Sequence, residues 1–136
     1  MLIRAITEKY AVSEQIAPED FPAISEAGFT TVICNRPDIE NPPFLHAHVM
    51  AEAAALAGLQ FVNLPLMHQT MTPDNITKQF DIVENAEGPV LAYCASGTRC
   101  SVIWALSQSG KQSADDILAQ TAQAGYDLSG LRGALG

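Results

Sequence analysis

The segment PVLAYCASGTRCSVIWAL, residues 89–106, joins two apolar runs through a short loop of small and polar residues. Cys94 closes the first run, Gly97 lies within the loop, and Arg99 stands just before the second run. Small residues and a glycine let the backbone curl so that successive N–H groups converge on one point, where the dipole of a following helix adds positive partial charge. The pattern therefore predicts an anion-binding loop.

Cys94 is the candidate nucleophile of this loop. Backbone dipoles and a nearby guanidinium lower the pKa of a thiol, and the thiolate is the nucleophilic form. Arg99 can hold an oxyanion through two parallel hydrogen bonds, and a cation at a helix N-terminus is explained by such an anionic partner. A lone cysteine at a strand end is more often a buried hydrophobic residue. The combination of Cys94, Gly97 and Arg99 favours covalent chemistry on a small anionic substrate.

The elements that position the loop follow from the hydrophobic pattern. Three apolar runs with branched or aromatic residues predict buried strands at Phe29–Asn35, Leu59–Leu66 and Pro89–Cys94. Weaker strand patterns lie at Leu2–Ile6 and Tyr10–Val12. Prolines at helix starts and glycines just past helix ends predict the intervening helices. These helices are expected at Pro18–Ala27, Pro43–Ala57, Pro73–Ala86, Ser101–Ser107 and Ser113–Ala124.

Alternating strands and helices predict the fold class. We expect an α/β protein with a central, mostly parallel sheet of about four or five strands, right-handed crossovers and helices on both faces. The length of 136 residues fits one domain, residues 1–136, with one hydrophobic core. Ligands of such sheets bind beyond the carboxyl ends of the strands, which is where the Cys94 loop is expected.

The composition excludes several classes of partner. Apolar residues make up 48% of the chain and charged residues 16%, which predicts a packed globule. The formal net charge of −8 argues against nucleic acid and against an anionic membrane surface. The first fifteen residues contain no apolar segment typical of a secretory signal or a membrane span, so we expect a cytoplasmic protein.

The three cysteines, Cys34, Cys94 and Cys100, lack the paired spacing of metal ligands. Their odd number and scarcity also argue against a disulfide framework. We therefore expect free thiols, no metal and no cofactor.

The loop C-A-S-G-T-R-C resembles the active-site loop of the cysteine-dependent phosphatase superfamily. With VSEQIAPEDF near the start and TVICNRPD after the second strand, the chain more closely resembles the phosphatase-like domain of bacterial β-lactamase-hydrolase-like proteins over nearly its whole length. The resemblance implies a dual-specificity-phosphatase-like fold, with Cys94 as nucleophile and Arg99 as anion binder. By position, the backbone N–H donors to the anion would come from Ala95, Ser96, Gly97 and Thr98.

Two features depart from the phosphatase pattern. Four residues separate Cys94 from Arg99, where typical tyrosine and dual-specificity phosphatases have five. This spacing is similar to that of rhodanese-like sulfurtransferases, whose cysteine carries a persulfide and needs a smaller cradle. In addition, the residue after the arginine, commonly Ser or Thr in phosphatases, is Cys100. Cys100 is a candidate resolving thiol that would trap oxidised Cys94 as a disulfide.

The general acid is a third departure from the phosphatase pattern. Cleavage of a phosphoester needs a proton for the leaving alkoxide, and phosphatases usually supply it from an aspartate on a loop. In the corresponding stretch, Leu64–Asn75, His68 is the titratable residue at the expected place, whereas Asp74 reads as a first-turn helix residue. We therefore take His68 as the candidate acid. Sulfur transfer needs no such proton donor.

Two residues of the Asn-Arg-Pro-Asp segment complete the candidate site. Arg36 and Asp38 follow the strand at Phe29–Asn35, so they are expected at the same edge of the sheet as the Cys94 loop. Arg36 would add a second positive charge for the substrate, and Asp38 would orient it. A surface turn with a local Arg and Asp pair of little energetic weight is the alternative.

Three functions remain open from the sequence. The first is a phosphatase with a Cys94 phosphocysteine, and the second is a sulfurtransferase with a Cys94 persulfide. The third is a non-catalytic module that binds anions. All three take a small anionic ligand, and none indicates an oligomeric state.

Overall fold

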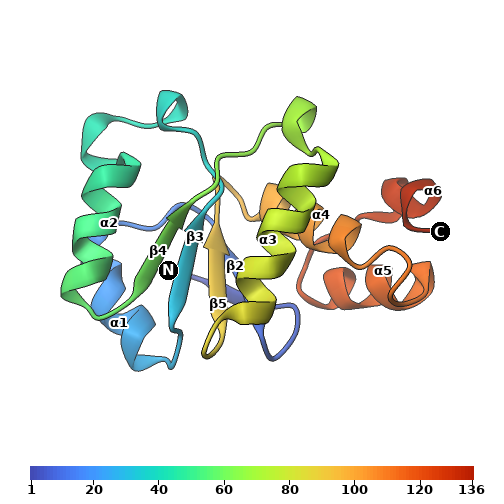
Figure 1. The fold of residues 1–136 in the computed structure, drawn as a ribbon, viewed down its shortest axis with the longest axis horizontal. Helices are drawn as coiled ribbons and strands as arrows, with labels where there is room; N and C mark the ends of the chain where they lie inside the picture. Colours follow the sequence, from blue (N-terminus) through green and yellow to red (C-terminus); the bar gives the residue numbers. More distant parts are fainter.

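The computed structural model describes residues 1–136 and has a mixed five-stranded sheet at its centre (Figure 1). The strands lie across the sheet in the order β1, β2, β5, β3, β4. Their bounds are Ile3–Ala5 for β1, Tyr10–Ser13 for β2, Thr31–Cys34 for β3, Gln60–Asn63 for β4 and Val90–Tyr93 for β5. β1 is antiparallel to β2 and all other pairs are parallel, so the expected mostly parallel sheet is confirmed.

Helices cover both faces of the sheet (Figure 1). The α-helices are α1 (Phe21–Glu26), α2 (Ala47–Leu56), α3 (Pro73–Asn85), α4 (Thr98–Ser107), α5 (Ala114–Gln123) and α6 (Arg132–Leu135). Short 3₁₀ turns are η1 (Pro18–Asp20), η2 (Asp38–Glu40), η3 (Pro43–Leu45), η4 (His68–Thr70) and η5 (Ser129–Leu131). α1 and α2 lie on one face, and α3, α4 and α5 lie on the other (Figure 1). No helix has both the length and the apolar character needed to cross a membrane.

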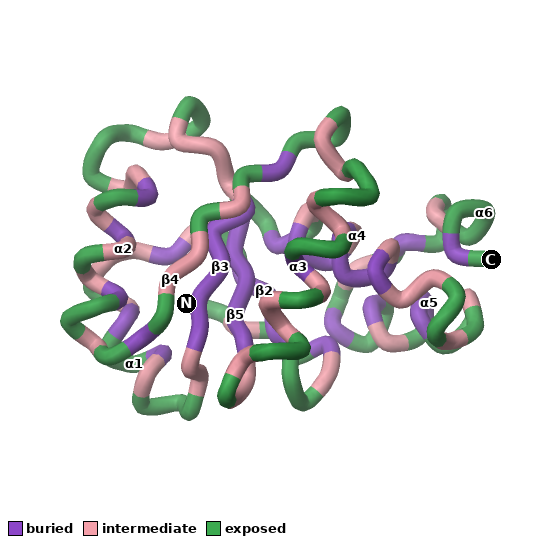
Figure 2. The backbone as a smooth tube through the Cα atoms, viewed as in Figure 1, coloured by how far each residue is buried: buried purple, intermediate pink, exposed green.

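The strand alternation divides the core between the two faces. On β5, Leu91 and Tyr93 join the cluster under α1 and α2, whereas Val90 and Ala92 join the cluster under α4 and α5. Because successive side chains point to opposite faces, a strand covered on both sides is apolar at every position. β3 and β5 are buried along their whole length (Figure 2).

The predicted elements are confirmed with two corrections. Each predicted strand and helix is present, although the helix expected at Pro43–Ala57 is broken after η3 by the extended backbone of His46. The strand predicted as buried within Leu59–Leu66 is instead an edge strand. β4 pairs only with β3, and its end residues Gln60 and Asn63 are exposed. A continuous apolar run marks a strand but does not reveal its place in the sheet.

Candidate active site

The loop after β5 curls over the Cys94 thiol. Cys94 is the first residue beyond β5, Gly97 has the left-handed φ of +89°, and α4 begins at Thr98. This φ favours glycine, and a Cβ at Gly97 would also overlap the Tyr126 hydroxyl. That hydroxyl donates a hydrogen bond of 2.9 Å to the Ser96 carbonyl, and the Gly97 N–H donates to the Cys94 sulfur at 3.1 Å. The close-packed curl therefore aims an N–H group at the thiol.

The environment of Cys94 lowers its pKa to about 5. The largest cause is a hydrogen bond from the Cys100 thiol; burial acts in the opposite direction, and the backbone N–H groups of Cys100, Ser96 and Gly97 lower the pKa further. Cys94 is only 1% exposed, whereas Ala95 and Ser96 above it are exposed. At neutral pH the thiol is therefore a thiolate beneath a solvent-facing loop.

Cys100 lies in the first turn of α4 and is completely buried. Burial raises the pKa of its thiol well above the ordinary value, so Cys100 stays protonated and donates to Cys94. The Tyr10 hydroxyl donates a 2.8 Å hydrogen bond to the Cys100 carbonyl. All three cysteines are free thiols. The structure brings Cys94 and Cys100 together, and a disulfide between them stays a prediction.

Arg99 is held at the edge of the loop by two other segments. Its Nη1 and Nη2 donate to the two carboxylate oxygens of Glu40, each at 2.8 Å, and Nη1 also donates to the Leu66 carbonyl at 2.9 Å. A guanidinium has five N–H donors, so Nε–H and one Nη2–H stay available side by side. These two adjacent donors have the fork geometry that binds an oxyanion.

Glu40 is the site residue that sequence reasoning missed. It lies in η2, and its carboxylate accepts from Arg36 Nε at 3.2 Å as well as from Arg99. The hydrogen bond from Arg99 is the main cause that lowers the Glu40 pKa. The spacing of four residues between Arg36 and Glu40 was the available signal. The contact with Arg99 spans 59 residues and has no local signature.

The structure places Arg36 and Asp38 near this carboxylate. Besides Glu40, Arg36 contacts the Gln15 side-chain oxygen at 3.3 Å, so its charge is partly engaged within the protein. The Asp38 carboxylate accepts the backbone N–H of Ala47 at 2.8 Å, which stabilises the start of α2. Contacts of Arg36 and Asp38 with a substrate stay predictions.

His68 lies on the same edge of the sheet. It opens η4 and is exposed, two residues after the Leu66 carbonyl that accepts from Arg99. Asp74 lies in the first turn of α3 and is exposed, in agreement with its interpretation as a helix-terminal charge. The position of His68 near the loop is compatible with proton donation, which stays a prediction. The structure has no group of three His, Cys, Asp or Glu side chains that could hold a metal ion.

A buried polar network joins the segments that form the site. Asn35 and Gln79 exchange two side-chain hydrogen bonds of 2.9 Å. Asn35 also donates to the Leu64 carbonyl at 2.8 Å, and Gln79 donates to the Tyr10 hydroxyl at 3.1 Å. Buried amides need such partners, because an unpaired one costs about 1–3 kcal/mol. The network therefore fixes the ends of β3 and β4 relative to the segment that carries Cys100.

Comparison with known families assigns the chain. The family described as "Beta-lactamase hydrolase-like protein, phosphatase-like domain" matches residues 2–111. The chain belongs to this family. A beta-lactamase hydrolase-like protein of Agrobacterium fabrum is 32% identical over 125 residues, which cover 90% of this chain and 29% of that protein. The phosphatase-like domain thus spans less than a third of the length of the curated relatives that it matches.

Solved structures confirm the expected fold of this phosphatase-like domain. The crystal structure of a "putative phosphatase" from Neisseria meningitidis has a TM-score of 0.85 at 31% identity, covering 99% of this chain and 96% of that chain. The P. aeruginosa protein TpbA in complex with phosphotyrosine has a TM-score of 0.66 at 16% identity, covering 98% and 89% of the two chains. At that identity the second likeness is one of fold alone.

Proposed function

We propose that this domain is a cysteine-dependent phosphatase that hydrolyses small phosphate monoesters through a phosphocysteine at Cys94. The observation that carries the proposal is the loop geometry: the Gly97 N–H donates to the Cys94 sulfur at 3.1 Å, and this environment lowers the pKa of the thiol to about 5. A thiolate is the form that attacks phosphorus. Membership of a phosphatase-like family and the similarity to a phosphotyrosine-binding protein support a phosphate ester as substrate.

In the first step the Cys94 sulfur attacks phosphorus, an S–P bond forms, and the P–O bond to the leaving group breaks. The exposed phosphoryl oxygens accept from the free Nε–H and Nη2–H of Arg99. Further backbone donors to these oxygens come from Ala95, Ser96, Gly97 and Thr98. In the free protein the Gly97 N–H donates to the Cys94 sulfur and the Thr98 N–H donates to the Ser96 hydroxyl, so these two groups must turn to the phosphoryl oxygens when the substrate binds. These contacts stabilise the negative charge that the transition state spreads over three oxygens.

Proton transfer and hydrolysis complete the reaction. His68 supplies the proton that the departing alkoxide needs, because it is the titratable side chain next to the Leu66 segment that contacts Arg99. A water molecule then attacks phosphorus, the S–P bond breaks, and phosphate leaves. The Cys100 thiol stabilises the thiolate that is regenerated, as it does in the free protein.

Arg36 and Asp38 have supporting roles in the proposal. Arg36 shares the Glu40 carboxylate with Arg99, so two cations face one anion at this edge and leave positive charge for the substrate. Asp38 orients the same segment by holding the start of α2. The two arginines favour an anionic ligand at this edge despite the net charge of −8 for the whole chain.

The test is a parallel assay of two reactions. The purified domain, its Cys94→Ser variant and its Cys34→Ser variant are each assayed with p-nitrophenyl phosphate and with thiosulfate plus cyanide. Cys34 is a matched control, since it is also a buried cysteine at the end of a parallel strand. We expect turnover of the aryl phosphate, its loss in Cys94→Ser and its retention in Cys34→Ser, with a phosphorylated Cys94 peptide after acid quench.

Two outcomes would overturn the phosphatase assignment. Turnover of thiosulfate alone, lost in Cys94→Ser, would assign sulfur transfer, which the four-residue spacing between Cys94 and Arg99 keeps as the alternative. Turnover of neither substrate, with Cys94 alkylated at neutral pH as slowly as a free thiol, would leave a module that binds anions.

A further inference from the structure

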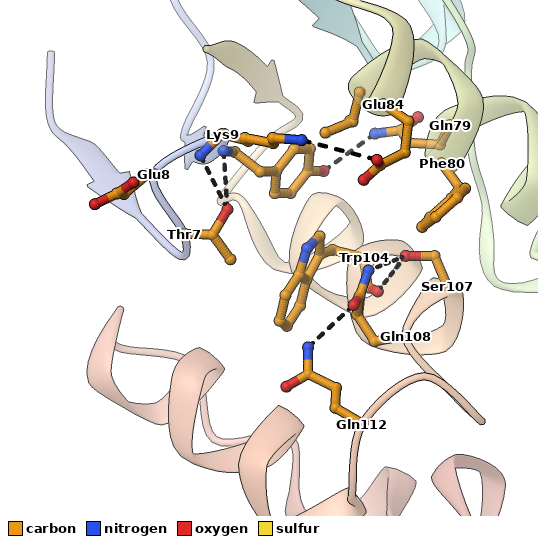
Figure 3. Close-up of a pocket in the computed structure, with 12 residues that line it drawn as sticks. Thr7, Glu8, Lys9, Gln79, Phe80, Glu84, Trp104, Ser107, Gln108 and Gln112 are labelled. Atoms are coloured by element: carbon orange, nitrogen blue, oxygen red, sulfur yellow. Dashed lines mark hydrogen bonds and ion pairs between the residues drawn. The ribbon is translucent and has the colours of Figure 1, made fainter.

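A cavity of about 380 Å³ lies at the end of the sheet opposite the Cys94 loop. It is formed by the turn between β1 and β2, by the middle of α3 and by the second half of α4 (Figure 3). Neither Cys94 nor Arg99 lines it, and no other cavity of the structure includes them. Its volume is at the small end of the range for sites that bind small organic molecules. The proposed phosphatase reaction leaves this cavity without a role.

The lining combines aromatic faces with side-chain amides. The rings of Trp104 and Phe80 line the cavity, and Gln108 and Gln112 lie beside Trp104, with the Gln112 amide directed at the Gln108 amide (Figure 3). Aromatic faces bury a planar ring with a geometric preference for stacking or edge contacts. The Gln112 amide donates to the Gln108 carbonyl oxygen at 3.0 Å and the Gln108 amide donates to the Ser107 hydroxyl at 3.3 Å, so one N–H of each amide and the Gln112 carbonyl oxygen are left for a ligand. The lining therefore matches a planar molecule that carries both donors and acceptors.

Three charged residues, Glu8, Lys9 and Glu84, line the cavity. Lys9 and Glu84 form an ion pair of 3.8 Å at the rim. The Glu8 carboxylate points away from Trp104 and the glutamines (Figure 3), so no unpaired charge is directed into the cavity. This arrangement favours a neutral occupant.

We propose that this cavity is a second binding site, for a neutral heteroaromatic amide such as a nicotinamide-like ring, and that its occupation reduces the reactivity of Cys94. The ring would stack on Trp104, and its carboxamide would pair with the glutamine amides. The occupant differs in charge from the substrate of the Cys94 loop, because the loop gathers backbone N–H donors and the cavity gathers neutral amides.

A hydrogen-bonded path connects the cavity with Cys94. Tyr10 and Gln79 both line the cavity, and Gln79 donates to the Tyr10 hydroxyl. The single O–H of Tyr10 donates to the Cys100 carbonyl in the first turn of α4, and Gly97, which directly precedes this turn, donates its N–H to the Cys94 sulfur. An acceptor on the ligand would compete for the Tyr10 O–H and release the turn that holds Cys100. The coupling is thus a competition between the ligand and the Cys100 carbonyl for the single O–H donor of Tyr10.

Trp104 reports binding directly because it is the only tryptophan of the chain and lines the cavity. We expect nicotinamide and benzamide to quench its fluorescence saturably, and the isosteric carboxylates nicotinate and benzoate to bind about tenfold more weakly. Val83→Phe fills the cavity and should abolish quenching. Val49→Phe, on α2, is the control for adding the same volume to a half-buried valine elsewhere. Equal binding of amides and carboxylates, or quenching that survives Val83→Phe, would overturn the site.

The coupling is measured by alkylation of Cys94 with iodoacetamide at pH 6, which needs no turnover. Nicotinamide should slow this alkylation by about fivefold. Tyr10→Phe should slow it without ligand and remove the response, while Trp104 quenching persists. An unchanged response in Tyr10→Phe, or no effect of nicotinamide on alkylation, would overturn the coupling. These readouts stand apart from the proposed function, because an inactive protein with saturable quenching would fail the phosphatase assay alone.

Discussion

The two ends of the sheet suit ligands of different charge, although the same helix, α4, contributes residues to both ends. At the carboxyl end, the Cys94 loop meets the N-terminus of α4, whose free N–H groups and dipole favour negative charge. At the other end, the C-terminal half of α4 brings Trp104 and Gln108 beside the turn that precedes β2. One helix therefore supplies donors for an anion at its start and a neutral, aromatic wall near its end.

The two ends also differ in what holds them. The Cys94 loop is curled by Gly97 and tied through the ion pair of Arg99 with Glu40, and its residues Ala95, Ser96 and Thr98 are exposed to solvent. The cavity lies between α3, α4 and the turn before β2, and its wall residue Trp104 is only 5% exposed. An exposed loop suits a substrate that reacts and leaves, whereas a preformed cavity between packed elements suits a ligand that stays bound. Five predictions test this separation.

Substitution of Arg99 should have the largest effect on the catalytic end. Arg99→Lys replaces the side-on fork by a single ammonium, so kcat/KM for p-nitrophenyl phosphate should fall roughly 10²- to 10³-fold. The matched control is Arg132→Lys, because Arg132 forms an exposed ion pair with Asp115 on another surface. Nicotinamide quenching of Trp104 should be unchanged in both variants. Full activity of Arg99→Lys would show that the paired Nε–H and Nη2–H donors of Arg99 are not needed for catalysis.

Substitution of His68 should discriminate between leaving groups. Without a proton donor, His68→Ala should lose about 10²-fold in kcat for phenyl phosphate, whose leaving group needs protonation. Turnover of p-nitrophenyl phosphate, with a more acidic leaving group, should change little. The comparison of kcat for both esters between pH 5 and 8 measures this difference. Equal losses for the two esters, or no loss for either, would end the role of His68 as acid.

Substitution of Cys100 should move the acidic limb of the pH profile. The Cys94 pKa of about 5 lies below its ordinary value chiefly because of the Cys100 thiol, so reactivity is expected to be lost as the pH falls through about 5. Cys100→Ala removes this donor and should raise the midpoint by about 1–2 pH units. Cys100→Ser keeps a donor and should keep the midpoint low. Identical alkylation profiles for the wild type and Cys100→Ala would contradict the assigned cause.

The same pair of variants tests the predicted redox role of Cys100. Peroxide takes two electrons from the Cys94 thiolate to give a sulfenic acid; attack by the Cys100 sulfur then expels water and forms the disulfide. Wild-type protein inactivated by excess peroxide should recover with dithiothreitol. Cys100→Ser should proceed to the sulfinic acid and stay inactive. Equal recovery of both proteins would leave Cys100 as a hydrogen-bond donor only.

Substitution of Glu40 should have the smallest effect. Glu40→Gln keeps an acceptor for Arg99 but removes the charge from a partly exposed ion pair, so kcat/KM should fall only about threefold to tenfold, mainly through KM. Asp115→Asn, which weakens the exposed pair with Arg132, is the control. A rise in affinity for sulfate in Glu40→Gln would instead mean that Glu40 competes with the substrate for Arg99.

Most of the fold and the centre of the site could be predicted locally. The strands and helices followed from apolar runs bounded by proline and glycine, and the loop from Cys94 to Arg99 followed from its position between two such runs. The edge position of β4 could not be predicted from the sequence, since strand pairing depends on contacts between segments that are distant in the chain. Glu40 was missed for the same reason: its contact with Arg99 joins segments that only folding brings together.

The sequence alone determined which groups are available: a thiol, a glycine and an arginine in one loop of six residues, and a second thiol directly after the arginine. Their order along the chain suffices because a strand, a turn and a helix N-terminus are local structures. Only the tertiary structure decided which donors of Arg99 are free, how Tyr10 and Gln79 join Cys100 to the cavity, and that the cavity exists. Long-range hydrogen bonds and cavities depend on distances between segments, and the local pattern of residues along the chain does not specify these distances.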